Sequence, residues 1–587
     1  MSRRRNPVPS PRLRGWFVAD APDFRHRSRW LALAFLAMAI TLTARLLDVQ
    51  VRQHSALATA AAALHQKSVV IPATRGRILD STGRVLVSNR TIYDVYADPG
   101  LIQVATRGDV ARRLAPALSM DTTSIDSLIS KPTRFVYLSK GVSQDVSDRL
   151  TALQLPGIVV VPAEQRVYEP SPVGGSSFAA NLLGYVNNDG HGQYGLESYY
   201  ESVLHGSDGR QSTVRDVAGN SITLSNDPQA DARNGNDLQL GLDSQVQYWA
   251  EQALAQGVAS AQASSGTLIM MDTKSGTIKA WAQAPTYDAN SYWASPIASL
   301  RDLAVANVYE PGSVEKVVTF AGGLNAHAIT PGYTFNEGPT TINGATIHDW
   351  DNRAHGTINM QYVLDLSLNN GAIKIGQLMG PDAFYSNQLA FGIGAPTGVD
   401  LAGEQNVPLP AQPSQSPLDL AEDAFGQHVQ VTPVEVLAAI NAVANGGVWV
   451  QPHAVQAVID PSTGRSTPVV PTTRRVISAE AAATLSQMMT GVVEDKGGEG
   501  SLARIPAFKG QVAGKTGTAS VAQNGRYGDN LVVSFAGFLP AKNPQFTMLV
   551  VLNYPHEGFV QRFGATLAAP VWKQVAQVTI DQWRILP

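Results

Sequence analysis

The chain has 587 residues, of which 44% are hydrophobic, enough to build two or three folded domains. Charged residues make up only 16% and the net charge is -3, which argues against a nucleic-acid-binding protein, because such a protein needs a basic face. The chain has no cysteine, so disulfides, thiol catalysis and cysteine-ligated zinc are excluded.

The first 29 residues differ from the rest of the chain. They hold eight arginines against two aspartates and many prolines, a composition typical of a disordered tail. The run from Trp30 to Ala44 carries no charge and predicts a helix of about 22 Å. Arg45 can snorkel, which extends a transmembrane helix over residues 30–50 toward the ~30 Å hydrocarbon core. The arginines before this helix predict a cytoplasmic N-terminus, with the remaining chain outside the cytoplasm.

Two alternatives to this anchor stay open. The run Ala56-Leu57-Ala58 resembles the cleavage site of a signal peptide, although a polar stretch separates it from the apolar run. A buried core helix is the other alternative. The sequence favours the uncleaved anchor, and no later stretch is apolar enough for a second span.

The part that follows the anchor mixes helices and strands. Residues 51–67 are rich in alanine and predict a helix, and residues 68–99 alternate as strands do, with a turn at 80–83. Residues 196–206 predict one helix that ends at a glycine. Residues 225–240 are polar and rich in turn formers, so we expect a domain boundary near residue 235.

The C-terminal part begins and ends with strands. Asp243 predicts the N-cap of a helix, and the next strands form a hairpin around residues 274–276. Three late strands are predicted at residues 511–521, 531–540 and 546–555, and a last helix at 568–584. Strands at both ends with helices between them predict an α+β fold in which helices cover an antiparallel sheet.

Ser313 and Lys316 are the first candidate catalytic pair. A serine hydroxyl is a poor nucleophile unless a base removes its proton, and residues three apart share one face of a helix. Pro311 and Gly312 predict the start of that helix, which places Ser313 at the positive end of the helix dipole. Lys316 must be neutral to act as a base, and burial or a second cation would lower its pKa.

Two further motifs follow in the sequence. Ser367 and Asn369 flank Leu368 in a predicted loop, where a hydroxyl and an amide can relay protons and hold a substrate amide. Lys515-Thr516-Gly517-Thr518 lies in a predicted strand and offers the second cation. Each motif alone is common: a serine is most often a helix cap, and a Lys-Thr-Gly run is most often a turn.

The order and spacing of the three motifs resemble the penicillin-recognising serine enzymes. The chain resembles a class B penicillin-binding protein, a monofunctional peptidoglycan D,D-transpeptidase, most similar to the FtsI-type division enzymes. The similarity extends to "RGRILDSTGRVLV" at 75–87, to the pedestal-like run "GQYGLESYYESVLHGSDG" and to "GQHVQVTPVEVLAAINAVANGG". The resemblance implies a pedestal, or dimerisation-like, domain at 51–235 and a transpeptidase domain at 236–587, after the tail at 1–29 and the helix at 30–50.

The resemblance also implies roles for the site residues. Ser313 would be acylated by the penultimate D-Ala of a stem peptide, with Lys316 as its base and Ser367 and Asn369 as the second motif. Lys515, Thr516, Gly517 and Thr518 would bind the substrate carboxylate, and the backbone N–H groups of Ser313 and Thr518 would form the oxyanion hole. No cofactor and no metal are implied.

This chain departs from the family pattern at two places. Leu368 stands where a small or polar residue is usual, and "EGSLA" at 499–503 replaces the usual Gly-Thr. These departures leave the shape of the second-motif loop, and of that edge of the site, open.

The implied partners are peptidoglycan stem peptides, β-lactam inhibitors, an FtsW-type (SEDS) glycosyltransferase and other membrane proteins of the division machinery. The Ser-x-Asn motif favours division over elongation, whose enzymes often carry Ser-x-Asp. A β-lactamase would also need a residue that activates water, and no sequence feature marks one. A non-catalytic β-lactam sensor or scaffold is a third alternative, which the intact motifs disfavour.

Overall fold

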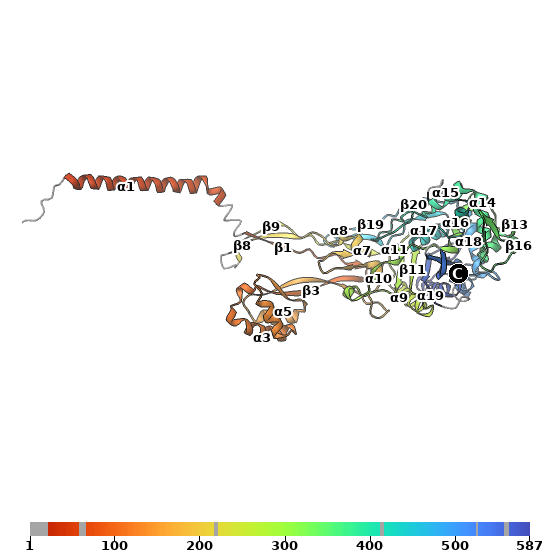
Figure 1. The fold of residues 1–587 in the computed structure, drawn as a ribbon, viewed down its shortest axis with the longest axis horizontal. Coiled ribbons are helices and arrows are strands. Elements are labelled where there is room, and N and C mark those ends of the chain that lie inside the picture. The colour runs from red at the N-terminus through yellow and green to blue at the C-terminus, as the bar shows by residue number, and fades with distance from the viewer. Residues whose placement is uncertain (1–21, 58–65, 216–220, 411–415, 524–525, 557–562) are drawn as a thin grey trace, which may run out of the picture. The chain divides into compact units, whose positions relative to one another are not determined.

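The computed structural model describes residues 22–57, 66–215, 221–410, 416–523, 526–556 and 563–587. The chain divides into two units, each of which is described by itself (Figure 1). The first unit comprises residues 1–72 and 208–232, and the second comprises residues 73–207 and 233–587. The predicted domain limits at 29, 50 and 235 stay predictions.

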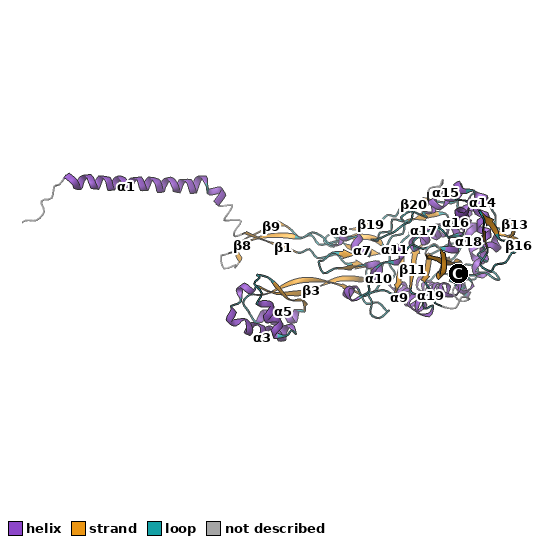
Figure 2. Ribbon diagram, viewed as in Figure 1, coloured by secondary structure: helices purple, strands orange, loops and turns teal. Residues whose placement is uncertain are grey.

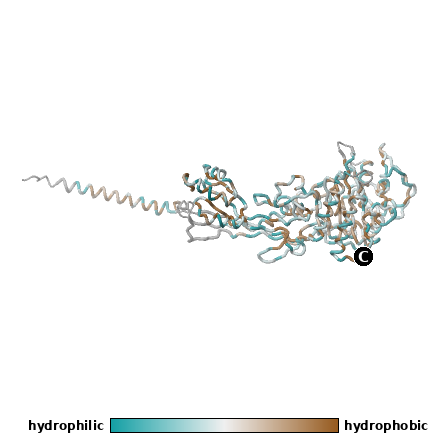
Figure 3. Tube along the Cα trace, turned by 90° about the horizontal axis from the view of Figure 1, so that it is seen from below, coloured by the Kyte–Doolittle hydropathy of each residue, from teal (hydrophilic) through white to brown (hydrophobic). Residues whose placement is uncertain are grey.

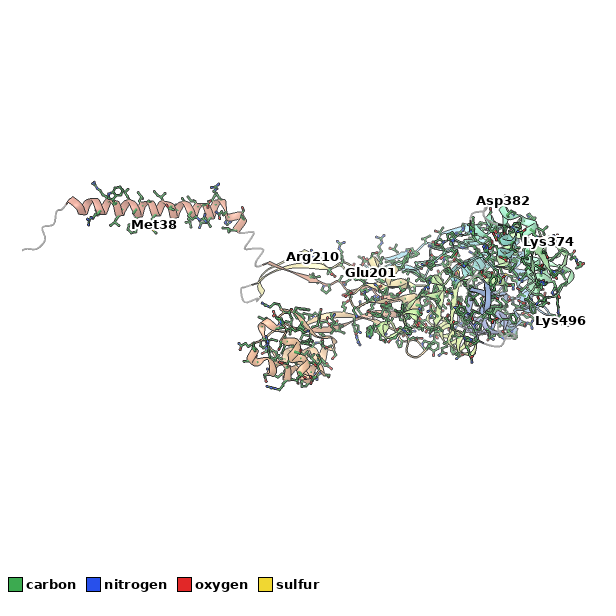
Figure 4. All side chains as sticks on the ribbon, viewed as in Figure 1. Met38, Glu201, Arg210, Lys374, Asp382 and Lys496 are labelled. Atoms are coloured by element: carbon green, nitrogen blue, oxygen red, sulfur yellow. The ribbon has the colours of Figure 1, made fainter. Side chains whose placement is uncertain are left out.

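The first unit contains a long apolar helix, α1 (Pro22–Leu47), followed by a π-helical turn at Asp48–Arg52. Within the segment Arg27–Arg52, the most apolar window of 18 residues has a mean hydropathy of 1.9, and none of that window is buried. Met38 lies near its middle with its side chain exposed (Figure 4). The segment is long and apolar enough to cross a membrane, as the prediction of an anchor at 30–50 requires.

A three-stranded antiparallel sheet completes the first unit, with strand order β1 (Gln66–Ile71), β8 (Gly209–Arg215), β9 (Ser221–Ala230). One prediction is wrong here. The helix predicted for 51–67 does not reach its end, because Gln66 and Lys67 pair with the distant strand β8, which overrides the local preference. In the stretch 225–240, where we expect a domain boundary, β9 continues to Ala230 and β10 (Asp237–Leu240) follows.

The N-terminal part of the second unit is built on a seven-stranded sheet. Its strands are β19 (Ser466–Pro468), β18 (Val455–Ile459), β10, β2 (Ile78–Leu79), β3 (Val85–Ala97) and β4 (Val136–Val142) in this order, with β5 (Ile158–Tyr168) also paired with β3. The predicted turn joins β2 to β3, where the carboxylate of Asp80 accepts hydrogen bonds from the backbone N–H groups of Thr82 and Arg84. Three helices share a small apolar core with this sheet: α3 (Arg107–Leu118), α4 (Thr122–Ile129) and α5 (Gln144–Ala152).

The single helix predicted for 196–206 is two short helices. α7 (Gly195–Tyr199) and α8 (Glu201–Leu204) are separated at Tyr200, whose backbone is not helical. The buried carboxylate of Glu197 explains the break, because it pairs with Arg75 of the segment before β2 and with Arg166 of β5 and fixes the first turn in place.

The C-terminal part contains the predicted antiparallel sheet, which has five strands. Its strands run in the order β12 (Ile278–Ala284), β11 (Ser265–Asp272), β23 (Phe546–Asn553), β22 (Arg526–Leu539), β21 (Ala513–Gln523). Hydrophobic residues are brown along the trace in Figure 3. Every residue of β23 is buried, and its residues 548–552 form a continuous apolar run. Such a run indicates that both faces of the sheet are covered.

Helices cover the two faces (Figure 2). α9 (Ser244–Ser260), capped by Asp243 as predicted, and α19 (Gly564–Trp583) share one apolar core with the sheet. Residues that alternate with these along the strands belong to a second core with the remaining helices. The main helices of that second layer are α12 (Lys316–Asn325), α13 (Met360–Asp365), α14 (Asn369–Met379), α15 (Pro381–Phe391), α16 (Pro417–Ala424), α17 (Pro433–Ala444) and α18 (Ala479–Glu494).

Candidate active site

Ser313 lies in a 3₁₀ turn, Gly312–Val314, that leads directly into α12. Gly312 has φ +56, and a Cβ on it would lie 2.9 Å from the carbonyl oxygen of Thr518. Only glycine therefore lets this turn approach the edge strand β21 so closely. The turn half-buries Ser313, and its hydroxyl has no hydrogen-bond partner among the described residues.

Lys316, the first residue of α12, is fully buried. Its Nζ donates to the carbonyl oxygen of Ser367 and, at 2.8 Å, to Oδ1 of Asn369. Burial, and next the charge of Lys515, lower the pKa of Lys316 to about 7. A lysine with such a pKa is partly neutral near neutral pH, and the neutral amine can accept a proton from a neighbouring hydroxyl.

The second motif brings the two lysines together. Ser367 is buried and adopts φ +57, an uncommon conformation for a serine, and Asn369 begins α14. Oγ of Ser367 lies 2.7 Å from Nζ of Lys515 and 3.4 Å from Nζ of Lys316. The unusual Leu368 is fully buried in the main core, so it anchors the loop between the two polar residues. The hydroxyl of Ser367 can therefore pass a proton between the two amines.

Lys515 lies on β21, the edge strand of the sheet, and its side chain is fully buried. Burial lowers the pKa of Lys515 to about 8, although nearby acidic residues oppose the shift. A Cβ on Gly517 would lie 2.2 Å from Oγ of Ser534 and 2.8 Å from Val314, so glycine is needed here too. Thr518 is half-buried, and its Oγ1 accepts a hydrogen bond from the backbone N–H of Gly564 at 3.2 Å.

The structure thus brings Lys316, Ser367, Asn369 and Lys515 into one hydrogen-bonded group, with Ser313 on the turn beside Thr518. Lys316 and Ser367 are 51 residues apart in sequence, and Ser367 and Lys515 are 148 residues apart. A carbonyl carbon bonded to Oγ of Ser313 would lie between the partly neutral amine of Lys316 and the outer edge of β21. This arrangement is suited to acyl transfer.

Two acidic residues at the site were missed by the sequence reasoning. Asp349 holds the second motif in place: its carboxylate accepts hydrogen bonds from the backbone N–H groups of Asn369 and Asn370 and from the side chain of Asn370. Glu499 accepts a hydrogen bond from Oγ1 of Thr516 at 2.8 Å. No pattern marks Asp349, whereas the unusual "EGSLA" run was the available signal for Glu499.

Glu337, Asp349 and His355 form a group of described residues whose ligand atoms all lie within 4.8 Å of one another, which would be compatible with a metal ion. Glu337 accepts a hydrogen bond from the backbone N–H of His355 at 2.7 Å, and burial together with a hydrogen bond to Asp349 raises the pKa of Glu337 to about 7.

Comparison with known proteins decides the family. The model of the penicillin-binding protein transpeptidase domain matches residues 266–577, and that of the penicillin-binding protein dimerisation domain matches residues 70–240. The chain belongs to the class B penicillin-binding proteins. The predicted family and fold class are confirmed, and the transpeptidase part holds all three motifs.

Curated relatives and solved structures cover most of this transpeptidase. Stage V sporulation protein D of Bacillus subtilis is 30% identical over 524 residues, covering 87% of this chain and 79% of the relative. Peptidoglycan D,D-transpeptidase FtsI of Escherichia coli is 28% identical, covering 88% and 85%. A peptidoglycan synthetase of Bifidobacterium adolescentis has a TM-score of 0.70 at 25% identity, covering 89% of this chain and 97% of that one. Penicillin-binding protein 3 of Mycobacterium tuberculosis, complexed with aztreonam, has a TM-score of 0.67 at 25% identity, covering 88% and 98%.

Proposed function

We propose that this transpeptidase crosslinks peptidoglycan stem peptides during cell division, with Ser313 as its nucleophile. One observation carries the proposal: a buried lysine with a pKa near 7 follows Ser313 by three residues and contacts the second motif, which in turn contacts Lys515. The similarity to peptidoglycan D,D-transpeptidases, FtsI among them, supports the D,D-transpeptidase activity.

In the proposed first half-reaction, Oγ of Ser313 attacks the carbonyl carbon of the penultimate D-Ala. The proton of the hydroxyl passes to Nζ of Lys316, and the backbone N–H groups of Ser313 and Thr518 stabilise the oxyanion, each typically worth ~3–4 kcal/mol. The bond to the terminal D-Ala then breaks. The nitrogen of the leaving D-Ala takes a proton from Oγ of Ser367, and a neighbouring lysine, Lys316 or Lys515, replaces that proton.

In the second half-reaction, the amine of a neighbouring stem peptide attacks the ester carbonyl. The amine gives up a proton to the same relay, the new amide bond forms, and Ser313 recovers its hydroxyl. β-Lactams resemble the D-Ala-D-Ala end and would acylate Ser313 in the same way. The ligand carboxylate is assigned to Lys515, Thr516 and Thr518.

Labelled penicillin tests this assignment. Purified protein is expected to form one covalent adduct, which mass spectrometry maps to the peptide containing Ser313, and Ser313→Ala should abolish it. Lys496→Ala is the matched control, because Lys496 is exposed in the loop after α18 and should leave the adduct unchanged. An adduct that persists in Ser313→Ala would place the nucleophile elsewhere.

The division role is the finer part of the proposal. The Ser-x-Asn form of the second motif supports it, while relatives named FtsI and Stage V sporulation protein D match at similar identity. A fluorescent fusion is expected to concentrate at midcell in growing cells. Sidewall localisation would instead assign the chain to elongation.

A further inference from the structure

Glu499 lies in the loop between α18 and β21, which Lys496 marks in Figure 4. Two glycines fix the course of this loop. Gly497 has φ +92, and a Cβ on Gly498 would lie 2.4 Å from the carbonyl oxygen of Val492. The backbone N–H of Glu499 donates to the carbonyl oxygen of Asp365 at 3.1 Å. The loop therefore holds the Glu499 side chain against β21.

The carboxylate of Glu499 lies beside Thr516 and Lys515. Its Oε2 accepts the hydrogen bond from Oγ1 of Thr516 at 2.8 Å and lies 4.0 Å from Nζ of Lys515. The Glu499 side chain is 24% exposed, whereas that of Lys515 is fully buried. Glu499 is thus placed between solvent and two of the three residues, Thr516 and Lys515, to which the proposed function assigns the ligand carboxylate.

The hydrogen-bond donors of Thr516 and Lys515 are already used. A threonine hydroxyl has one proton, and Thr516 gives its proton to Glu499. The ammonium of Lys515 donates to Oγ of Ser367 at 2.7 Å, to the carbonyl oxygen of Thr516 at 3.1 Å and to Oγ1 of Thr516 at 3.3 Å. An incoming carboxylate that binds the hydroxyl of Thr516 must therefore displace Glu499, and it meets a like charge there.

We propose that Glu499 is a specificity-determining residue that selectively weakens the binding of ligands ending in a free carboxylate, β-lactam acids included. This inference rests on the proposed function, because it uses the assignment of Thr516 and Lys515 to the ligand carboxylate. It predicts that removing the charge of Glu499 favours anionic over neutral ligands, without changing which residue is acylated.

Other charged groups also face the lysines. Lys316 faces Lys515, Glu499 and Asp349, and Lys515 faces Glu499 and Asp365. Removing the charge of Glu499 would therefore also lower the pKa of Lys316, since Glu499 raises it. That effect changes the acylation rate for all ligands alike, so the test must compare an anionic ligand with a neutral one of the same structure.

Benzylpenicillin and its methyl ester form such a pair. Acylation of Ser313 is followed by intact-protein mass spectrometry for the wild type, Glu499→Gln and Glu499→Ala. In both variants the second-order rate constant for the acid, divided by that for the ester, should rise about tenfold, the range for a hydrogen bond to a charged group. Glu480→Gln removes one charge from the exposed start of α18 and should leave the ratio unchanged.

The outcomes separate the two proposals. An unchanged or lower ratio in both Glu499 variants, with Ser313 still acylated, overturns the role of Glu499 and leaves the proposed function intact. A lower ratio would mean that Glu499 assists the anionic ligand, by positioning Thr516 or by keeping Lys515 protonated. If neither ligand acylates Ser313 of the wild-type protein, the proposed function itself is overturned.

Discussion

At the scale of single residues, the site depends on two lysines that share one serine hydroxyl. Ser367 adopts φ +57, a conformation that costs of order 1–3 kcal/mol for a residue other than glycine and persists when the surroundings over-determine it. Here Lys316 and Lys515 hold it from both sides, and Asp349 fixes the residues that follow. We expect this strain to keep Oγ of Ser367 within reach of both amines.

The pH dependence of acylation should follow Lys316. Below about pH 7 this lysine is mainly protonated and cannot accept the proton of Ser313, so the rate of acylation by benzylpenicillin should rise as pH increases through about 7. Lys515→Ala removes a charge that lowers the pKa of Lys316, so the rise should move to higher pH. The variant should also be slower overall, because a contact to the ligand carboxylate is lost.

The measurement is the acylation rate constant between about pH 5 and 9, a range that spans the expected titration. Lys496→Ala, which removes an exposed lysine, should keep the wild-type profile. A rise at the same pH in Lys515→Ala and the wild type would contradict the coupling between the two lysines.

At the scale of elements, the site is the place where the start of α12 meets the edge strand β21. The turn Gly312–Val314 reaches this position because Gly312 has no side chain, and because Gly517 of β21 leaves room for Val314 of the turn. The loop before α14 and the loop after α18 supply Ser367 and Glu499. Each contact therefore depends on a local close approach of backbone.

Gly312→Ala should slow acylation and lower the free energy of unfolding by ~1–3 kcal/mol. Its Cβ would lie 2.9 Å from the carbonyl oxygen of Thr518, and φ +56 would be strained, so the turn must move away from β21. Urea unfolding and penicillin acylation measure the two effects.

Gly464→Ala is the matched control, because φ there is +70 and a Cβ would have nothing within 4 Å. It should cost stability through backbone strain and leave acylation unchanged. Equal acylation in both variants would show that the turn tolerates displacement from β21.

At the scale of the whole molecule, the proposed topology places one transmembrane helix between a cytoplasmic tail and the catalytic part. The segment Arg27–Arg52 has the length and hydropathy for this role, and its large apolar side chains, such as Trp30 and Phe35, are exposed. In water, exposed apolar side chains in such a row are unfavourable, whereas in lipid they are not.

Protease added outside spheroplasts should degrade the chain beyond about residue 50 and spare the arginine-rich tail. An epitope at the N-terminus and an antibody against the catalytic part follow the two regions on one blot. Permeabilised cells, in which the tail should also be degraded, are the control. A soluble mature protein that begins near residue 59 would show that the segment is a signal peptide.

Replacement of residues 30–50 by an unrelated membrane helix should weaken co-purification with an FtsW-type glycosyltransferase and leave penicillin acylation of Ser313 intact. A monofunctional transpeptidase needs a glycan polymerase beside it, and small residues such as Ala37, Ala39 and Ala44 let helices approach closely in lipid. A swapped helix that retains these three alanines should restore part of the complex. Unchanged co-purification and growth after the full swap would show that the helix only anchors the chain in the membrane.

The sequence by itself determined the features that depend on neighbouring residues. The Ser-x-x-Lys pair, the cap at Asp243, the hairpin and the three late strands follow from spacing, capping and periodicity, and together with the second and third motifs they predict the family and the fold class. Gln66–Ile71 shows the limit, since its preceding alanines predict a helix while the distant strand β8 makes it a strand.

Only the tertiary structure decided the protonation and the hydrogen bonding of the site residues. The burial of Lys316, its contact with Asn369, the grip of Asp349 on the second motif and the contact of Glu499 with Thr516 all join segments separated along the chain. Desolvation and Coulomb interactions depend on distance in space, so no local pattern specifies them. The motifs indicate which residues are the candidate catalytic groups, and the packing around these residues sets their protonation and hydrogen bonding.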